Sequence, residues 1–235
     1  MIKIENLHKN FGKNQVLKGV DLDIAQGGIF AILGPNGSGK TTLIKSILGM
    51  VIPNEGDIFI DNILIKKSWK YRQQIDYLPQ IANFPANLTV QELIKMIKDL
   101  RNKPGNDEGL ITSFQLTPFL DKKLSNLSGG TKQKVNLVLT LMFDSPLIIL
   151  DEPTTGLDPI ALLELKKIIQ QEKDKGKTIL ITSHIMSFVE EIADEIVFLL
   201  EGKVYFKGDI HTLKEKTKEN DFEHAIANLL KENNA

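Results

Sequence analysis

The sequence predicts an α/β protein whose central sheet is mostly parallel and is flanked by helices. Three short and nearly continuous apolar runs, at residues 29–33, 147–150 and 178–182, are typical of strands buried on both faces. Each run is followed by a loop and a plausible helix, the order that gives right-handed crossovers in a parallel sheet. The 235 residues suffice to bury a core, and the absence of cysteine excludes a disulfide framework and thiolate metal sites.

The N-terminal part of the chain predicts a second, smaller sheet. Residues 2–24 have a strand-like pattern with a turn around residues 10–14, and residues 57–65 are a further strand-like stretch. We expect these stretches to pair as a small antiparallel β subdomain beside the parallel core.

Helical patterns occupy the middle and the end of the chain. Residues 89–143 predict mainly helix, with breaks at Pro104-Gly105 and near residues 124–127. We interpret about residues 84–145 as a helical insertion rather than a separate domain. The predicted domains are a main domain over residues 1–208, which contains the insertion, and a helical C-terminal tail over residues 209–235.

Two helices are also predicted from their first residues. Asp158 can cap a helix, and Pro159 suits its first position because no amide donor is needed there. A second helix is expected to begin near Ser128. The apolar stripes that follow are Leu162, Leu165 and Ile169 in the first helix and Val135, Val138, Leu139 and Met142 in the second.

Residues 34–41 match the phosphate-binding loop G-x-x-x-x-G-K-[ST]. Its glycines let the backbone curl so that N–H groups point at phosphate oxygens, and the helix that begins near Lys40 adds its positive dipole end. Lys40 is expected to reach the β- and γ-phosphates, and the Thr41 hydroxyl is expected to bind Mg²⁺. The predicted nucleotide-binding residues of this segment are Gly34, Pro35, Asn36, Gly37, Ser38, Gly39, Lys40, Thr41 and Thr42.

Two adjacent carboxylates follow the second apolar run. Asp151 and Glu152 stand where a buried strand emerges, and ligands of open α/β sheets lie at such carboxyl ends. Asp151 is predicted to hold Mg²⁺, directly or through a water, and Glu152 to orient and deprotonate the attacking water. A strand that simply meets solvent is the alternative, and the phosphate loop in the same chain favours the catalytic interpretation.

Between these segments, residues 127–135 read Leu-Ser-Gly-Gly-Thr-Lys-Gln-Lys-Val and resemble the signature sequence of ABC-type ATPases. The resemblance extends from Ile2 to about Gly208, with every motif in the family's order, and implies a RecA-like phosphate-loop core. Ser128, Gly129 and Gly130 at a helix start also form a second anion site. In the family, the signature of one subunit closes over the ATP that the other subunit holds. Thr131 stands where the family usually has Gln, and its side chain has a shorter reach.

The resemblance assigns roles to further residues. It implies that Phe11 stacks on adenine with Val16 beside it, although a lone Phe could equally belong to the core. Gln80 would sense Mg²⁺ and water and face the membrane partner, and His184 would contact the γ-phosphate rather than serve structure. Residues 156–158 resemble the loop that crosses the dimer interface. The predicted catalytic residues are Lys40, Gln80, Glu152 and His184, and the predicted metal-binding residues are Thr41, Gln80 and Asp151.

The function implied by the resemblance is that of the ATP-binding and ATP-hydrolysing subunit of an ABC transporter. Two chains, identical or related, would close on two MgATP and pass the motion through the Gln80 region and the insertion to an integral-membrane permease. The net charge of −1 argues against a nucleic-acid partner. No apolar run approaches the ~20 residues of a membrane span, so we expect a cytoplasmic protein held peripherally at the inner face of the membrane.

Within the family, the segment from Tyr77 to Val90 and the signature with Thr131 are similar to ATPases paired with six-helix, ABC-2-like export permeases. Among these, the chain resembles the ATPase of the copper/nitrous-oxide-reductase maturation transporter. The alternative is a soluble ABC-type ATPase with a ribosome- or DNA-associated role. Ribosomal ABC proteins normally carry two cassettes, chromosome ATPases need a long coiled coil, and a small-molecule kinase would lack the signature and His184.

Overall fold

The computed structural model describes residues 1–232, and its centre is a six-stranded, mostly parallel sheet. The strand order is β10-β9-β3-β8-β7-β6, and only the edge strand β10 runs antiparallel to its neighbour within this described sheet. The three predicted strands are β3, β8 and β7, which lie side by side at its centre. The strands are β3 (Gly28–Leu33), β6 (Ile75–Leu78), β7 (Leu147–Asp151), β8 (Thr178–Thr182), β9 (Glu195–Leu200) and β10 (Lys203–Gly208).

The second sheet is the predicted antiparallel one, with the order β2-β1-β4-β5. The single stretch predicted at residues 57–65 is in fact a hairpin, because Asp61 and Asn62 have positive φ angles of 48° and 63° and turn the chain between two strands. The strands are β1 (Ile2–Phe11), β2 (Asn14–Ile24), β4 (Glu55–Ile60) and β5 (Ile63–Leu64).

Alternate residues of β3 enter two different hydrophobic clusters, which explains its continuous apolar sequence. Ala31 packs among the helices of the large cluster, whereas Phe30 and Ile32 pack with the antiparallel sheet and α1 (Lys40–Ile47). The helix α1 therefore lies between the two sheets, and Leu43, Ile44, Ile47 and the following Leu48 are buried there.

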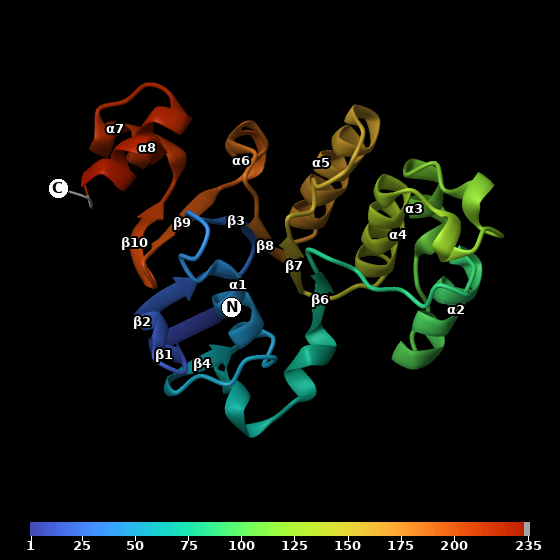
Figure 1. The fold of residues 1–235 in the computed structure, drawn as a ribbon, viewed down its shortest axis with the longest axis horizontal. Coiled ribbons are helices and arrows are strands. Elements are labelled where there is room, and N and C mark those ends of the chain that lie inside the picture. Colours follow the sequence, from blue (N-terminus) through green and yellow to red (C-terminus); the bar gives the residue numbers. More distant parts are fainter. Residues whose placement is uncertain (233–235) are drawn as a thin grey trace.

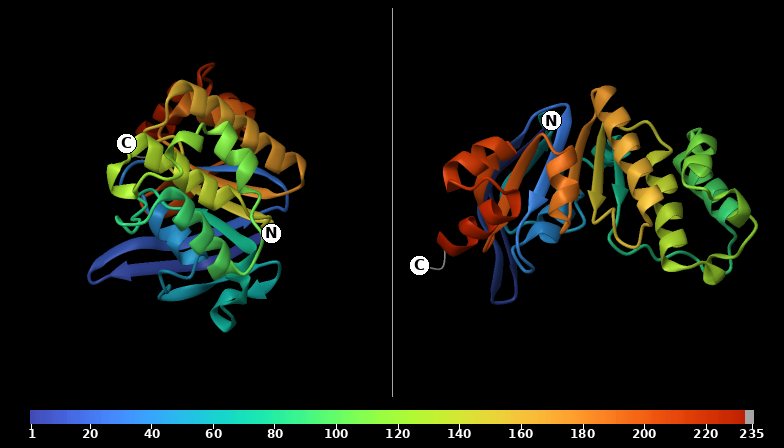
Figure 2. Two further views of the ribbon diagram at one scale, coloured as in Figure 1. Left: turned by 90° about the vertical axis from the view of Figure 1, so that its right-hand side faces the viewer. Right: turned by 90° about the horizontal axis from the view of Figure 1, so that it is seen from above.

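The remaining helices surround the large sheet. The insertion, drawn in green, lies beyond the β6 edge in Figures 1 and 2, whereas α7 and α8 lie at the β10 edge. Four 3₁₀ turns also occur in the described chain, at Ile65–Lys67, Lys70–Gln74, Thr117–Phe119 and Leu124–Asn126. The helices are α2 (Val90–Arg101), α3 (Asp107–Ser113), α4 (Gly129–Leu141), α5 (Pro159–Asp174), α6 (Met186–Ile192), α7 (Ile210–Thr217) and α8 (Phe222–Glu232).

Side-chain caps fix where the main helices begin. The Asp158 carboxylate accepts a hydrogen bond from the Ala161 N–H at 2.9 Å, and α5 begins at Pro159 as predicted. Ser128 Oγ accepts one from the Thr131 N–H at 3.2 Å at the start of α4. The predicted cap residues thus satisfy N–H groups that a helix leaves without partners.

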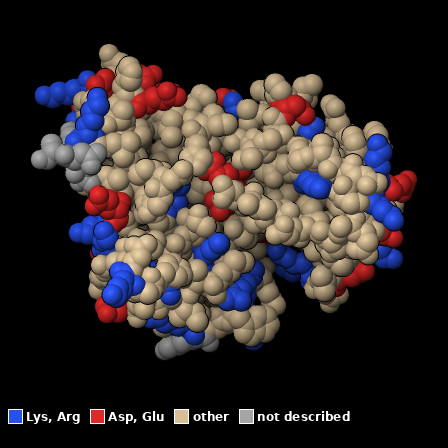
Figure 3. Space-filling model, in the orientation of Figure 1, with Lys and Arg blue, Asp and Glu red and all other residues tan. Residues whose placement is uncertain are grey.

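The predicted C-terminal tail contains α7 and α8, and α8 buries Phe222, Ala225 and Leu229 in the large cluster. The last three residues of the predicted tail, 233–235, lie outside the described residues. Over residues 1–232, none of the helices combines the length and the apolar character that crossing a membrane requires. Figure 3 shows acidic and basic side chains intermixed over one face, in keeping with the net charge of −1.

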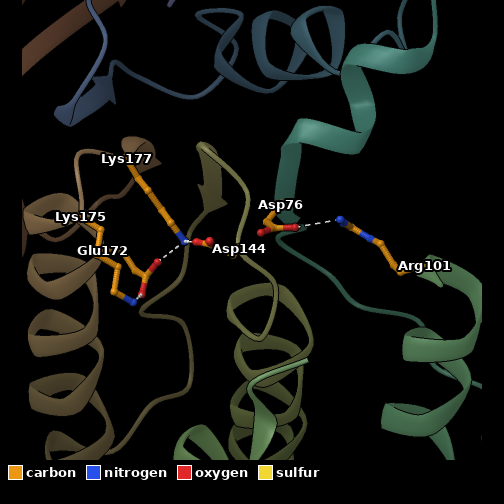
Figure 4. Close-up of polar contacts among 6 residues, drawn as sticks. All are labelled: Asp76, Arg101, Asp144, Glu172, Lys175 and Lys177. Atoms are coloured by element: carbon orange, nitrogen blue, oxygen red, sulfur yellow. Dashed lines mark hydrogen bonds and ion pairs between the residues drawn. The ribbon is translucent and has the colours of Figure 1, made fainter. Parts of the chain in front are cut away.

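The buried ammonium group of Lys177 connects the segments that precede β7 and β8 with α5 (Figure 4). Lys177 precedes β8, and its Nζ lies 2.8 Å from the Asp144 carboxylate and also donates to Glu172 of α5. Burial alone would lower the pKa of Lys177, but the hydrogen bonds that it donates to Asp144 and Glu172 raise the pKa above its usual value. Lys175 Nζ approaches the other oxygen of Glu172 at 2.6 Å.

We expect Lys177→Met to lower the free energy of unfolding by about 1–3 kcal/mol, because Glu172 then keeps only Lys175 as a partner. Urea unfolding followed by circular dichroism measures the change. Lys167→Met is the control, since its side chain is 64% exposed and its ammonium lies 3.9 Å from the Glu164 carboxylate. It should change stability by less than about 0.5 kcal/mol. Equal effects of the two substitutions would contradict the structural role of Lys177.

Candidate functional site

A pocket opens at the carboxyl ends of the central strands, where ligands of parallel sheets bind. Residues predicted from widely separated segments line it together, including the phosphate loop, the acidic pair and His184. Asn14 lines it as well and was not predicted. The lining residues are Asn14, Val16, Asn36, Gly37, Gly39, Lys40, Thr41, Thr42, Gln80, Asp151, Glu152 and His184.

The phosphate loop follows β3 with a backbone that only glycine permits at its first position. Gly34 has φ +146°, and a Cβ there would lie 2.0 Å from the Leu199 carbonyl oxygen. Pro35 continues the loop, and Ser38 Oγ is buried with no hydrogen-bond partner among the described residues. At the end of the loop, no side chain caps the first turn of α1 and no acidic residue lies in it. The backbone N–H groups of this first turn are therefore available to an anion.

The Lys40 ammonium bends back over the loop. Its Nζ donates to the carbonyl oxygens of Gly34 at 2.6 Å and Pro35 at 3.1 Å. Burial lowers the pKa of Lys40 below its usual value, although the nearby Glu152 and Asp151 carboxylates oppose this. In the described structure this cation donates to neutral carbonyl oxygens. A phosphate group bound in the loop would give it an anionic partner instead.

The acidic pair is held by a hydroxyl that the sequence interpretation missed. Thr182, at the end of β8, donates from Oγ1 to Asp151 Oδ1 at 2.6 Å and accepts from the Glu152 N–H at 2.9 Å. Glu152 has φ +53°, in the left-handed region that few residues other than glycine adopt. Such strain persists where surrounding contacts hold the backbone, and the Thr182 hydroxyl is one of them. A hydroxyl at the end of the third apolar run was the available signal.

The Glu152 carboxylate faces His184 across the pocket. Its Oε1 lies 3.0 Å from His184 Nε2, and the glutamate is buried whereas the His184 side chain is 54% exposed. Burial raises the pKa of Glu152; the neighbouring His184 opposes the increase and the Asp151 carboxylate adds to it. The imidazole therefore lies between a buried acid and the open side of the pocket.

The donor set fits Mg²⁺ only as part of a nucleotide complex. Thr41, Gln80 and Asp151 line the same pocket, and Asp151 is 3% exposed with one oxygen already bonded to Thr182. Across the chain as far as residue 232, no three His, Asp or Glu side chains gather as a metal site of their own. Mg²⁺ commonly keeps one or two protein ligands and takes the others from phosphate and water, which matches this set.

Phe11 lies outside the pocket lining, at the end of β1. Its ring is 51% exposed, so the interpretation of Phe11 as a core residue is wrong. The Lys9 ammonium lies 4.9 Å from the ring centroid and donates to the Ile52 carbonyl oxygen at 2.8 Å. The Phe11 ring is thus accessible at the surface, with a cation beside it, and it has room to stack on a base.

The signature residues Ser128, Gly129 and Gly130 do not line this pocket. They begin α4, the last helix of the insertion, which Figure 1 shows apart from α1. Ser128 and Gly129 are exposed, and the hydroxyls of Ser128 and Thr131 are 2.8 Å apart. Gly130 packs against the loop after β7, where a Cβ would lie 2.5 Å from the Gly156 carbonyl oxygen. The two predicted anion-binding elements of the chain thus lie in different places.

Sequence comparison relates the chain to known proteins. A profile of the ABC transporter family matches residues 17–155. The lantibiotic transport ATP-binding protein SrtF of Streptococcus pyogenes is 34% identical over 216 residues, which cover 87% of this chain and 89% of that protein. The Nod factor export ATP-binding protein I of Rhizobium meliloti (strain 1021) is 35% identical over 218 residues, which cover 90% of this chain and 65% of that protein.

Solved structures agree with the sequence comparison. The ATP-binding subunit of an ABC transporter superposes with a TM-score of 0.91 at 28% identity, over 98% of this chain and 99% of that chain. A dimeric structure of the bacterial ABC transporter cassette MJ0796 superposes with a TM-score of 0.81 at 27% identity, over 89% of this chain and 98% of that chain.

The two glycines of the signature should respond differently to an added methyl group. Gly130→Ala is expected to lower the free energy of unfolding by about 1–3 kcal/mol, because the methyl group meets backbone rather than a movable side chain. Gly129→Ala should not destabilise, since a Cβ there meets nothing within 4 Å and alanine favours a helix. Urea unfolding of both variants tests this, and a stable Gly130→Ala protein would contradict it.

Proposed function

The chain belongs to the ABC transporter family as one of its ATP-binding, ATP-hydrolysing subunits, and we propose that the pocket of Lys40, Glu152 and His184 hydrolyses MgATP within a dimer. The observation that carries the proposal is the meeting of these three residues, from three distant segments, at one edge of the sheet. Each brings a different chemistry: a cation for phosphate, a buried carboxylate for water, and an imidazole beside it.

Binding is assigned to the phosphate loop and α1. The free N–H groups and Lys40 would hold the β- and γ-phosphates. Thr41, Gln80 and Asp151 would hold Mg²⁺, which when bound neutralises charge on the phosphate oxygens. Thr182 keeps the Asp151 carboxylate oriented toward this position.

Hydrolysis is assigned to Glu152 as the general base. Burial favours its uncharged form, so the carboxylate accepts a proton from water more readily than an exposed glutamate does. His184, whose Nε2 lies 3.0 Å from Oε1 of that carboxylate, would fix its position, and the family resemblance assigns the imidazole to the γ-phosphate. Both residues line the same pocket as the phosphate loop.

The dimer is proposed because the signature lies outside the pocket of its own chain. A second copy, identical or related, would bring Ser128 and the α4 N-terminus over the γ-phosphate in an isologous pair. The similar MJ0796 cassette is dimeric, which supports this proposal. ATP would stabilise the closed pair because its γ-phosphate contacts both subunits, and loss of that phosphate would release them.

The partner is proposed to be an integral-membrane export permease, to which the chain binds peripherally on the cytoplasmic side. Two relatives whose names refer to lantibiotic transport and Nod factor export support this choice. Gln80, between the pocket and the insertion, would pass the motion to the permease. The similarity to the copper/nitrous-oxide-reductase maturation ATPase stays a prediction.

Glu152→Gln should retain ATP binding, lose nearly all turnover, and accumulate as an ATP-bound dimer, because the amide keeps the shape of the carboxylate but cannot accept the proton. ATP hydrolysis assays and light scattering at saturating MgATP measure the two effects. Glu164→Gln on α5, whose glutamate pairs only weakly with Lys167, is the matched control and should behave as the unmodified chain. Normal hydrolysis by Glu152→Gln would refute the base assignment, and a monomer would refute the homodimer.

Phe11→Ala should weaken ATP binding at least about fivefold, since stacking of a base on an aromatic ring contributes about 1–3 kcal/mol. Phe11→Tyr keeps an aromatic face and should bind ATP with nearly unchanged affinity. Titration with a fluorescent ATP analogue measures both dissociation constants. Equal affinity of Phe11→Ala and the unmodified chain would exclude Phe11 as the adenine platform.

A further inference from the structure

The strand β6 contains a buried carboxylate that the proposed reaction does not use. Asp76 is 0% exposed, and its Oδ1 lies 3.0 Å from Nη1 of Arg101, the last residue of α2 (Figure 4). The same strand leads directly to Pro79 and Gln80, and Gln80 lines the nucleotide pocket. One short strand therefore connects the pocket with the helical insertion.

Arg101 makes three contacts outside its own helix. Besides Asp76, its Nη2 donates to the Ile75 carbonyl oxygen at 3.3 Å, and its guanidinium lies 4.8 Å from the centroid of the Phe143 ring. Phe143 belongs to the loop between α4 and β7. A planar guanidinium that binds a carboxylate, a carbonyl and a ring has little freedom to rotate, so α2 is held at a defined angle to the sheet.

The strand β6 also contacts the signature helix. Asn136 of α4 donates from Nδ2 to the Pro79 carbonyl oxygen at 3.3 Å, and Thr140 donates to the Tyr77 carbonyl oxygen at 3.4 Å. The helix α4 begins at the signature. Any shift of β6 is thus shared by Gln80, by α2 and by the signature.

Removal of only one partner of the ion pair is energetically unfavourable, because the other charge then stays buried without a partner. Burial raises the pKa of Asp76, and the Arg101 cation beside it counteracts this. Two apolar side chains of similar volume would fill the site without desolvating charge and are often equally stable. The charged pair differs from apolar packing in that it fixes the orientation of α2 relative to β6.

We propose that the Asp76–Arg101 pair fixes the orientation of the helical insertion relative to β6 and thereby positions Gln80, which makes Arg101 a positioning residue for ATP hydrolysis. This inference rests on the proposed function of the pocket. Arg101 acts through Asp76 and the β6 backbone, and it touches neither nucleotide nor water.

The test compares the double variant Asp76→Leu/Arg101→Met with Lys98→Met. Lys98 lies on the same helix and pairs with Asp107 at 2.8 Å inside the insertion, so its loss leaves the link to β6 intact. We expect the double variant to fold, to bind ATP with unchanged affinity, and to lose at least about tenfold in kcat. Lys98→Met should keep both values. A double variant with normal kcat overturns the proposal.

A second readout follows the insertion itself. The chain contains no cysteine, so spin labels attach only to cysteines that are introduced. We choose two exposed positions for them, Lys95→Cys on α2 and Lys167→Cys on α5. The distance distribution between the labels should broaden in the double variant and stay unchanged with Lys98→Met. An unchanged distribution in the double variant also overturns the proposal.

Two further proteins keep the outcome interpretable. Should the double variant not fold, Arg101→Lys replaces it: it keeps the charge but loses the forked contact with Asp76 and Ile75, so kcat should fall while ATP affinity stays constant. A normal kcat in Arg101→Lys then overturns the proposal. Glu152→Gln runs in parallel, because normal hydrolysis there would refute the proposed function, whereas its loss beside a normal double variant refutes the positioning role alone.

Discussion

The parallel pairing of β3, β8 and β7 is the constraint on which the pocket depends. In this register Thr182 lies opposite Ile32 of β3 on one side and Asp151 of β7 on the other. Because the three strands end in the same row, the phosphate loop, the acidic pair and His184 leave the sheet at one edge. The buried apolar runs that drive this pairing thus also determine where the chemistry lies.

Two residues of this row have constrained backbone conformations. Gly34 turns against the Leu199 carbonyl oxygen, where no larger residue fits, and Glu152 adopts a left-handed conformation. The Thr182 hydroxyl, buried between the strands, satisfies both the Glu152 N–H and the Asp151 carboxylate. The sheet is continuous and covered on both faces, so it can hold these unfavourable turns in place.

The parts predictable from sequence are those with strong local signals: the central strands, the phosphate loop, the capped helices and the antiparallel sheet. The strand β6 was missed because Asp76 and Tyr77 interrupt its apolar pattern, and its burial depends on partners distant in sequence. The strand β9 was overlooked although residues 196–200 are apolar and buried, a signal as clear as that of β3. The link between Thr182 and the acidic pair depends on strand register, and the contact between Asp76 and Arg101 depends on helix packing. Neither has a period or motif in the sequence.

The separation of the signature from the pocket gives the proposed cycle its dependence on ATP. If Ser128 lay in its own chain's pocket, a single subunit could complete the site and closure would not require a second chain. Instead α4 presents Ser128 outward while its Asn136 and Thr140 hold the β6 backbone that leads to Gln80. In the proposed dimer, a partner's nucleotide bound at the start of α4 would act on the same strand that leads to Gln80. The two sites of a dimer would be coupled through β6, without any direct contact between the nucleotides.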